Sequence, residues 1–152
     1  MGSYLNPGNL SFRGSLRSKI YVDKSELIAR TNEALCTEQK YICVSRPRRF
    51  GKTLLMSMTD YFFSVNHSDC KKYFEGLDIW KEEKFRELQG TYPVIFISFA
   101  DVKQNNYEDA VQKIKNIIVD VYRQHRYLEQ QECFSESEKQ NILSVTEEMN
   151  DV

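Results

Sequence analysis

The sequence predicts an α/β fold in which helices cover both faces of a parallel sheet, giving three layers, α/β/α. Two apolar runs, residues 41–44 and 93–99, are nearly continuous in hydrophobic character, as in strands that are buried on both faces. Amphipathic patterns with helical spacing lie before, between and after these runs. A length of 152 residues suits one ordinary domain, so residues 1–152 are expected to form a single unit.

Residues 1–39 are expected to form an irregular lead-in and a first helix. The short apolar piece Ile20-Tyr21-Val22 precedes Asp23, which is a favourable N-cap residue, and Glu26 follows three residues later. This capping-box pattern predicts a helix over residues 24–34.

Residues 40–65 are expected to form a strand, a loop and a helix. The strand is 41–44, and Pro47 in the following segment ends it. From Lys52 apolar residues recur at spacings of three and four, which predicts a helix. The residues that carry this periodicity are Leu54, Leu55, Met58, Tyr61 and Phe62.

Residues 66–152 contain the second strand, 93–99, and several helices. Short amphipathic segments precede the strand, and a long helix is predicted from about Tyr107 to Leu128 after the turn-like Asn105-Asn106. Ser135 and Glu138 form a second capping-box pattern, which predicts a last helix.

Composition excludes some functions and leaves others open. The formal net charge of −1 gives no global reason to bind nucleic acid or anionic lipid, although Arg46, Arg48 and Arg49 form a local basic cluster. No apolar run approaches the roughly 20 residues needed to span a bilayer. No two of the four cysteines share a C-x-x-C spacing. The N-terminal residues do not resemble a secretory signal, and we expect none. We expect reduced thiols in a cytoplasmic protein without membrane partners.

The segment between the first strand and the second helix carries the strongest functional motif. Its sequence is Ser45-Arg46-Pro47-Arg48-Arg49-Phe50-Gly51-Lys52-Thr53, and Leu54 follows. Gly51-Lys52-Thr53 supplies the end of G-x-x-x-x-G-K-[ST], the phosphate-binding loop or P-loop, in which main-chain amides and a helix N-terminus face an anion. Arg46 stands where that pattern has its first glycine. A basic turn that merely caps a helix is the plainer alternative, and the strand and helix on either side favour the P-loop.

This segment, together with Tyr21-Val22-Asp23-Lys24-Ser25-Glu26-Leu27-Ile28, resembles the bacterial and archaeal AAA-ATPase-like family. Members share a YVDK-type lead-in and an RPRRFGK[ST] Walker A loop, so the resemblance accounts for Arg46. It covers most of the first hundred residues and implies a P-loop NTPase-like fold. By resemblance, residues 46–54 bind nucleotide, with the amides from Arg48 to Thr53 as the cradle. Lys52 would contact the β and γ phosphates of ATP, and Thr53 would be a ligand of Mg²⁺.

The resemblance also implies what this chain lacks. The magnesium-positioning aspartate, the catalytic glutamate and the sensor strand would lie beyond Val152, so the fold would be incomplete. Asp101, after the second strand, is a weak Walker B candidate, because Val102 stands where glutamate is expected. We therefore expect the N-terminal part of an ATPase that binds ATP and Mg²⁺ without hydrolysing ATP in isolation. Its partners would be its own C-terminal half or further copies of itself.

Two alternatives remain. The first is a non-enzymatic module that binds nucleic acid or a partner through Arg46, Arg48 and Arg49. The second is a small-molecule P-loop kinase, which would need an arginine-rich lid. The arginines after Arg49 are scattered, which disfavours it.

Overall fold

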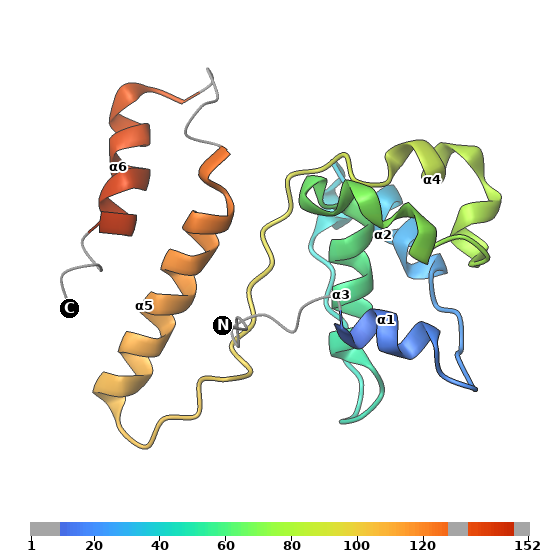
Figure 1. Cartoon of the computed structure of the whole chain (residues 1–152), viewed down its shortest axis with the longest axis horizontal. Coiled ribbons are helices and arrows are strands. Elements are labelled where there is room, and N and C mark those ends of the chain that lie inside the picture. Colours follow the sequence, from blue (N-terminus) through green and yellow to red (C-terminus); the bar gives the residue numbers. More distant parts are fainter. Residues whose placement is uncertain (1–9, 128–133, 148–152) are drawn as a thin grey trace. The chain divides into compact units, whose positions relative to one another are not determined.

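The computed structural model describes residues 10–127 and 134–147, and this part of the chain is mostly helical (Figure 1). Two compact units divide the chain. One, the unit Pro7–Val94, is described from Leu10 onward, and the other begins at Ile95 and is described over residues 95–127 and 134–147.

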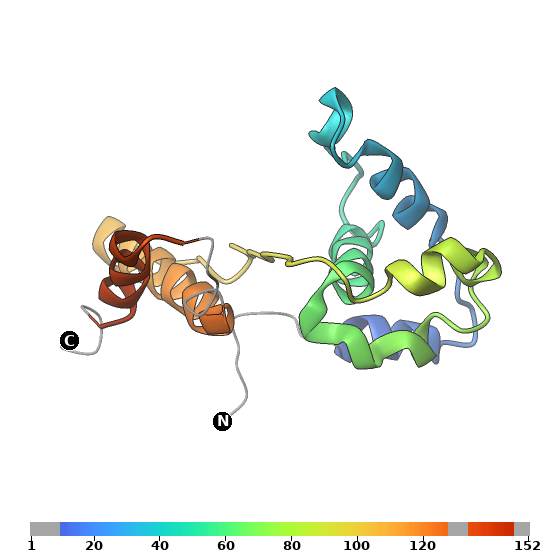
Figure 2. The ribbon, with the colours of Figure 1, turned by 90° about the horizontal axis from the view of Figure 1, so that it is seen from above.

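The unit Pro7–Val94 is built around helix α3, which contacts α1, α2 and the 3-10 segment η2 (Figure 1, Figure 2). Its elements in chain order are α1 (Leu10–Leu16), α2 (Glu26–Ala34), η1 (Glu38–Lys40), α3 (Lys52–Phe63), η2 (Val65–Tyr73), η3 (Asp78–Lys81) and α4 (Glu83–Leu88).

Aromatic side chains dominate the core of this unit. Phe12, Phe62 and Phe74 are fully buried and their rings lie together, with centroids 5.4 Å apart for Phe12 and Phe74 and 5.1 Å for Phe62 and Phe74. Met58, Tyr61 and Phe62 are buried, which confirms the apolar face predicted for the second helix. The core therefore fixes α3 along much of its length.

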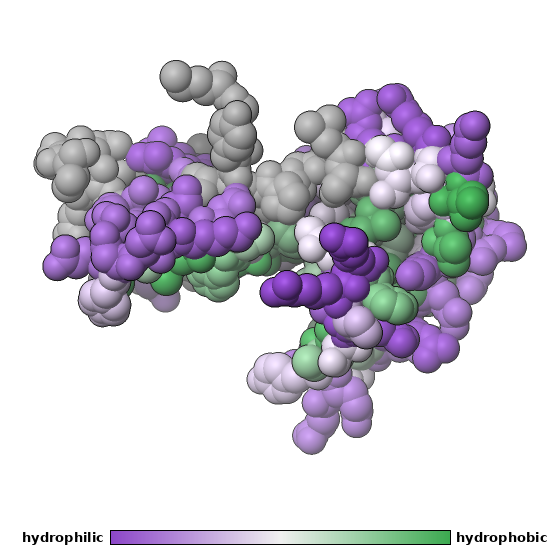
Figure 3. All heavy atoms as spheres, turned by 90° about the horizontal axis from the view of Figure 1, so that it is seen from below, coloured by the Kyte–Doolittle hydropathy of each residue, from purple (hydrophilic) through white to green (hydrophobic). Residues whose placement is uncertain are grey.

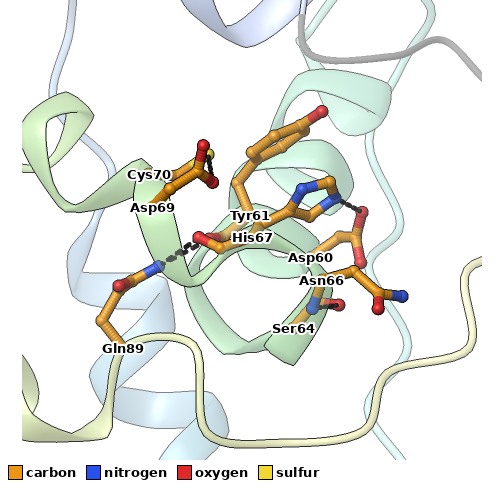
Figure 4. A network of polar contacts seen from close by, with 8 residues as sticks. All are labelled: Asp60, Tyr61, Ser64, Asn66, His67, Asp69, Cys70 and Gln89. Atoms are coloured by element: carbon orange, nitrogen blue, oxygen red, sulfur yellow. Dashed lines mark hydrogen bonds and ion pairs between the residues drawn. The ribbon is translucent and has the colours of Figure 1, made fainter. Parts of the chain in front are cut away.

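A polar network holds the C-terminal end of α3 (Figure 4). The Gln89 side-chain amide donates to the carbonyl oxygens of Tyr61 at 3.2 Å and His67 at 2.9 Å. The His67 ring stacks on Tyr61 with centroids 4.0 Å apart, and its Nε2 lies 3.4 Å from an Asp60 carboxylate oxygen. The Gln89 bonds therefore satisfy the Tyr61 carbonyl in the last turn of α3 and the His67 carbonyl in η2.

In the second unit, α5 (Tyr107–Gln124) packs against α6 (Glu136–Glu147). Asn106 caps α5 by accepting from the Asp109 amide at 2.8 Å. The predicted capping box of α6 is confirmed: Glu138 N–H donates to the Ser135 hydroxyl at 3.3 Å, and Ser135 N–H donates to the Glu138 carboxylate at 2.8 Å. The Ser135 hydroxyl also donates to the Glu138 carboxylate, at 2.7 Å, and this bond, followed by that of the Ser135 amide, lowers the pKa of Glu138.

The α/β fold class was wrong: the described residues form no sheet. The segments 41–44 and 93–99 are extended, yet no hydrogen bond joins their amides to another strand within the described residues. The described part contains one isolated parallel bridge, between Ser64 and Tyr92. The three-layer arrangement predicted from the apolar runs is therefore absent.

No sheet forms because an extended segment becomes a β-strand only when a neighbouring strand pairs with it. An extended segment buries its backbone donors and acceptors only when further strands pair with it. The described residues supply two such segments and no ladder between them, so apolar side chains remain in solvent. Ile95, Ile97 and Phe99 are 61%, 46% and 56% exposed, and Tyr41 is 87% exposed.

Hydrophobic surface is visible among the hydrophilic side chains in Figure 3. Within the described residues, no helix combines the length and apolar character needed to cross a bilayer.

Candidate functional site

Residues 45–51 form an irregular loop that leads directly into α3. Gly51 is the N-cap residue of the helix and has a left-handed backbone, with φ of 78°. A Cβ at Gly51 would meet only the Leu54 Cβ, at 3.9 Å. Glycine is therefore favoured here by backbone conformation and not by lack of space. Arg49 is also left-handed, with φ of 67°, and such strained positions are concentrated at functional loops.

The N-terminus of α3 is open. No side chain caps it, and the first amide with a helical acceptor is that of Leu55, which donates to the Gly51 carbonyl at 2.9 Å. No acceptor among the described residues pairs with the amides from Arg48 to Leu54. Free amides at the positive end of a 12-residue helix are a suitable environment for an anion.

Lys52 folds back over the loop. Its ammonium group donates to the carbonyl oxygens of Arg46 and Pro47, the latter at 3.5 Å. The lysine is therefore held beside the free amides of the helix, where its charge adds to the positive end of the helix dipole. Thr53 is exposed, and no described residue forms a hydrogen bond with its hydroxyl, which leaves the oxygen available to a cation.

A pocket of about 360 Å³ lies against this loop. One side is formed by the loop and the first turns of α3, and the other by the lead-in 20–24 and the end of α1. Its lining residues are Ser15, Ser18, Ile20, Tyr21, Val22, Lys24, Arg49, Phe50, Gly51, Leu54, Leu55 and Met58. The charged members, Lys24 and Arg49, are both cationic, and the rest of the lining is largely apolar.

Three arginines and one aromatic side chain project from the loop. Arg46, Arg48 and Arg49 are exposed, and no carboxylate among the described residues pairs with them. Phe50 is 57% exposed. Unpaired cations on an exposed loop are available for phosphate groups.

The predicted nucleotide-binding residues, 46–54, form the loop and the first turn of α3 in the unit Pro7–Val94. Asp101 belongs to the other unit. Asp101 is exposed in a turn after the extended segment 95–99. Its assignment as a Walker B residue therefore stays a prediction from sequence.

The sequence analysis missed the part of the pocket that comes from α1 and misassigned Asp23. Ser15 and Ser18 line the pocket, and no motif marks them. The predicted capping box of Asp23 and Glu26 is wrong. Helix α2 begins at Glu26 with Ser25 as N-cap, Glu26 pairs with Arg30, and Asp23 accepts instead from the amides of Ser25 and Asp78.

Burial of the Tyr21 side chain, with a smaller effect of the neighbouring Asp23 charge, raises the pKa of Tyr21 above its usual value. Its hydroxyl therefore stays protonated at neutral pH and lines the pocket as a neutral group.

Comparison with protein families gives a match over residues 12–151, to a family described as predicted AAA-ATPase. The chain belongs to this AAA-ATPase-like family. The match extends past the lead-in and the loop, through both extended segments and both helices of the second unit. Comparison with curated proteins and with solved structures gives no match. Membership of the AAA-ATPase-like family implies nucleoside triphosphate chemistry in general terms.

Proposed function

We propose that this AAA-ATPase-like chain is a nucleotide-binding module that takes ATP with Mg²⁺ at residues 46–54. The single observation that carries the proposal is the open N-terminus of α3, with Lys52 folded beside it and free amides from Arg48 to Leu54. Phosphate is the anion that such an arrangement suits best, because several amides and one ammonium group can share its charge.

Within this proposal each residue has a defined task. Lys52 exchanges its carbonyl partners for phosphate oxygens. The Thr53 hydroxyl joins the ligands of Mg²⁺, whose charge offsets that of the phosphates. Arg49 and Lys24 supply further positive charge at the pocket, and the apolar surface of Ile20, Val22 and Leu54 accommodates the nucleoside.

Hydrolysis needs a group that orients or activates water, commonly a carboxylate. The residues that line the pocket include no aspartate or glutamate. We therefore propose that this chain by itself binds ATP and does not turn it over at an appreciable rate.

The test is a titration with a fluorescent ATP analogue in the presence of Mg²⁺, on wild type, Lys52→Ala and the control Lys71→Ala. Lys71 is an exposed lysine outside the loop. We expect Lys52→Ala to weaken binding at least tenfold while Lys71→Ala matches wild type, because only Lys52 lies at the helix N-terminus. A folded wild-type protein that does not bind the analogue would refute the proposal, and a steady ATPase rate would refute its second half.

A second function, binding of nucleic acid through the loop, is favoured by the exposed Phe50 beside the unpaired arginines. Aromatic and cationic side chains together form common platforms for single-stranded nucleic acid. Binding of an oligonucleotide that falls steeply with salt and is unaffected by ATP would support this function over the first.

A further inference from the structure

The lead-in that forms one side of the pocket is attached to a distant part of the chain. One Asp23 carboxylate oxygen accepts from the Ser25 amide at 2.8 Å, and the other accepts from the Asp78 amide at 2.7 Å. The Ser25 hydroxyl accepts from the Ile79 amide at 3.1 Å. Asp78 and Ile79 are the first residues of η3, so the side chains of Asp23 in the lead-in and of the nearby Ser25 accept from the free amides at its start.

Side chains of the lead-in divide between two directions. Val22 and Lys24 line the pocket, whereas Asp23 does not line it and bonds to η3. Ile20 and Tyr21 line the pocket as well, so within 20–24 Asp23 is the residue whose side chain is directed elsewhere. Ser25 is completely buried, so its bond to Ile79 is shielded from water. Loss of such a bond leaves a buried amide unsatisfied.

We propose that Asp23 and Ser25 are positioning residues, which fix the nucleoside side of the pocket by holding the lead-in against η3. This inference rests on the proposed nucleotide site. Asp23 is not a magnesium ligand or a catalytic base in this scheme, because both of its oxygens accept from the main chain on the side away from the pocket.

The two sides of the pocket then have separable roles. The loop and the N-terminus of α3 bind phosphate, and their geometry depends on Gly51 and on the core packing of α3. The lead-in contacts the nucleoside, and its geometry depends on the bonds to η3. A ligand that carries phosphates without a nucleoside therefore distinguishes the two sides.

The experiment measures the affinity of two ligands, a fluorescent ATP analogue by direct titration and inorganic triphosphate by calorimetry, each with Mg²⁺. The variants are Asp23→Ala and Ser25→Ala, and the control is Glu26→Ala. Glu26 is adjacent in sequence, and its carboxylate bonds to Arg30 on the exposed face of α2. We expect each of the two variants to lose about tenfold in affinity for the ATP analogue, because each loses its one bond to η3. Affinity for triphosphate should change less than threefold, and the control should match wild type.

An equal loss for both ligands, or no loss for either, would overturn the inference while the nucleotide site stands. Wild-type protein that binds neither ligand overturns the proposed function and this inference with it. If circular dichroism shows that Asp23→Ala is unfolded, Asp23→Asn takes its place. Its carboxamide oxygen can still accept from Ser25, but its NH₂ group cannot accept from Asp78, so the same pattern of losses is expected.

Discussion

Three glycines in the unit Pro7–Val94 share a left-handed backbone and differ in the space around them. Gly51, Gly76 and Gly90 have φ of 78°, 90° and 74°. A Cβ would meet nothing within 4 Å at Gly76 and only the Leu54 Cβ at 3.9 Å at Gly51. At Gly90 it would lie 2.6 Å from the Ser68 Cα, which belongs to the backbone and cannot rotate away.

Replacement of each glycine by alanine should therefore give two sizes of effect. The left-handed conformation costs alanine about 1–2 kcal/mol in the folded state. Alanine also lowers the entropy of the unfolded chain, which stabilises the folded state by about 0.4–1 kcal/mol. Gly51→Ala and Gly76→Ala should each lower the free energy of unfolding by about 1 kcal/mol. Gly90→Ala adds an overpacking cost of about 1–3 kcal/mol, since Ser68 must move.

The assay is urea unfolding followed by circular dichroism, because all three positions lie in one unit and report on the same transition. Titration with the ATP analogue then separates Gly51 from Gly76. Both variants lose similar stability, but only Gly51→Ala should bind the analogue more weakly. A Gly90→Ala loss no larger than that of Gly76→Ala would refute the steric reasoning.

Three further predictions concern the rest of this unit. Gln89→Leu should lower the free energy of unfolding by about 1–3 kcal/mol, because the carbonyls of Tyr61 and His67 lose their donor. Urea unfolding checks this against Gln39→Leu, an exposed control in the same unit, and equal losses would contradict it. At neutral pH the exposed Cys36 and Cys43 should react with iodoacetamide in the native protein, whereas Cys70 should not. Cys70 is buried, and its burial, with the hydrogen bond to the neighbouring Asp69 carboxylate, raises the pKa of its thiol to about 11. Peptide mass mapping measures the extent of alkylation at each cysteine. Labelling of Cys70 as fast as that of Cys36 would show that its thiol is accessible and would contradict the prediction. Because the folded thiol stays neutral, its contribution to stability is complete below about pH 9 and is lost as the pH rises toward about 11.

Helix starts and buried helix faces that depend on nearby residues were predictable from the sequence. Strands, which depend on pairing with distant residues, were not. The Ser135 and Glu138 pair gave the start of α6, and spacing of three and four gave the buried face of α3, because both patterns act within one or two turns. The segment 93–99 was predicted as a strand from its own residues. Whether an extended segment becomes a strand depends on a partner, which no property of the segment specifies.

The candidate site divides in the same way. The sequence located the loop through Gly51-Lys52-Thr53, because those residue types are required by local backbone geometry and charge. It did not find the contribution of α1 to the pocket, or the bond from Asp23 to Asp78, which joins residues 55 positions apart. An aspartate two residues before a serine and three before a glutamate suits a helix cap as well as a bond to a distant amide, and only the fold decides between these two roles.

The position of the Lys52 ammonium group affects how any binding measurement at this loop is interpreted. In the structure the group already has two acceptors, the carbonyl oxygens of Arg46 and Pro47. Binding of an anion is then an exchange of acceptors at one nitrogen, and the measured affinity is the difference between the two sets of bonds. Removal of the lysine takes away a contact from the free protein as well as from the complex. The loss seen in Lys52→Ala thus understates the attraction between this ammonium group and a phosphate.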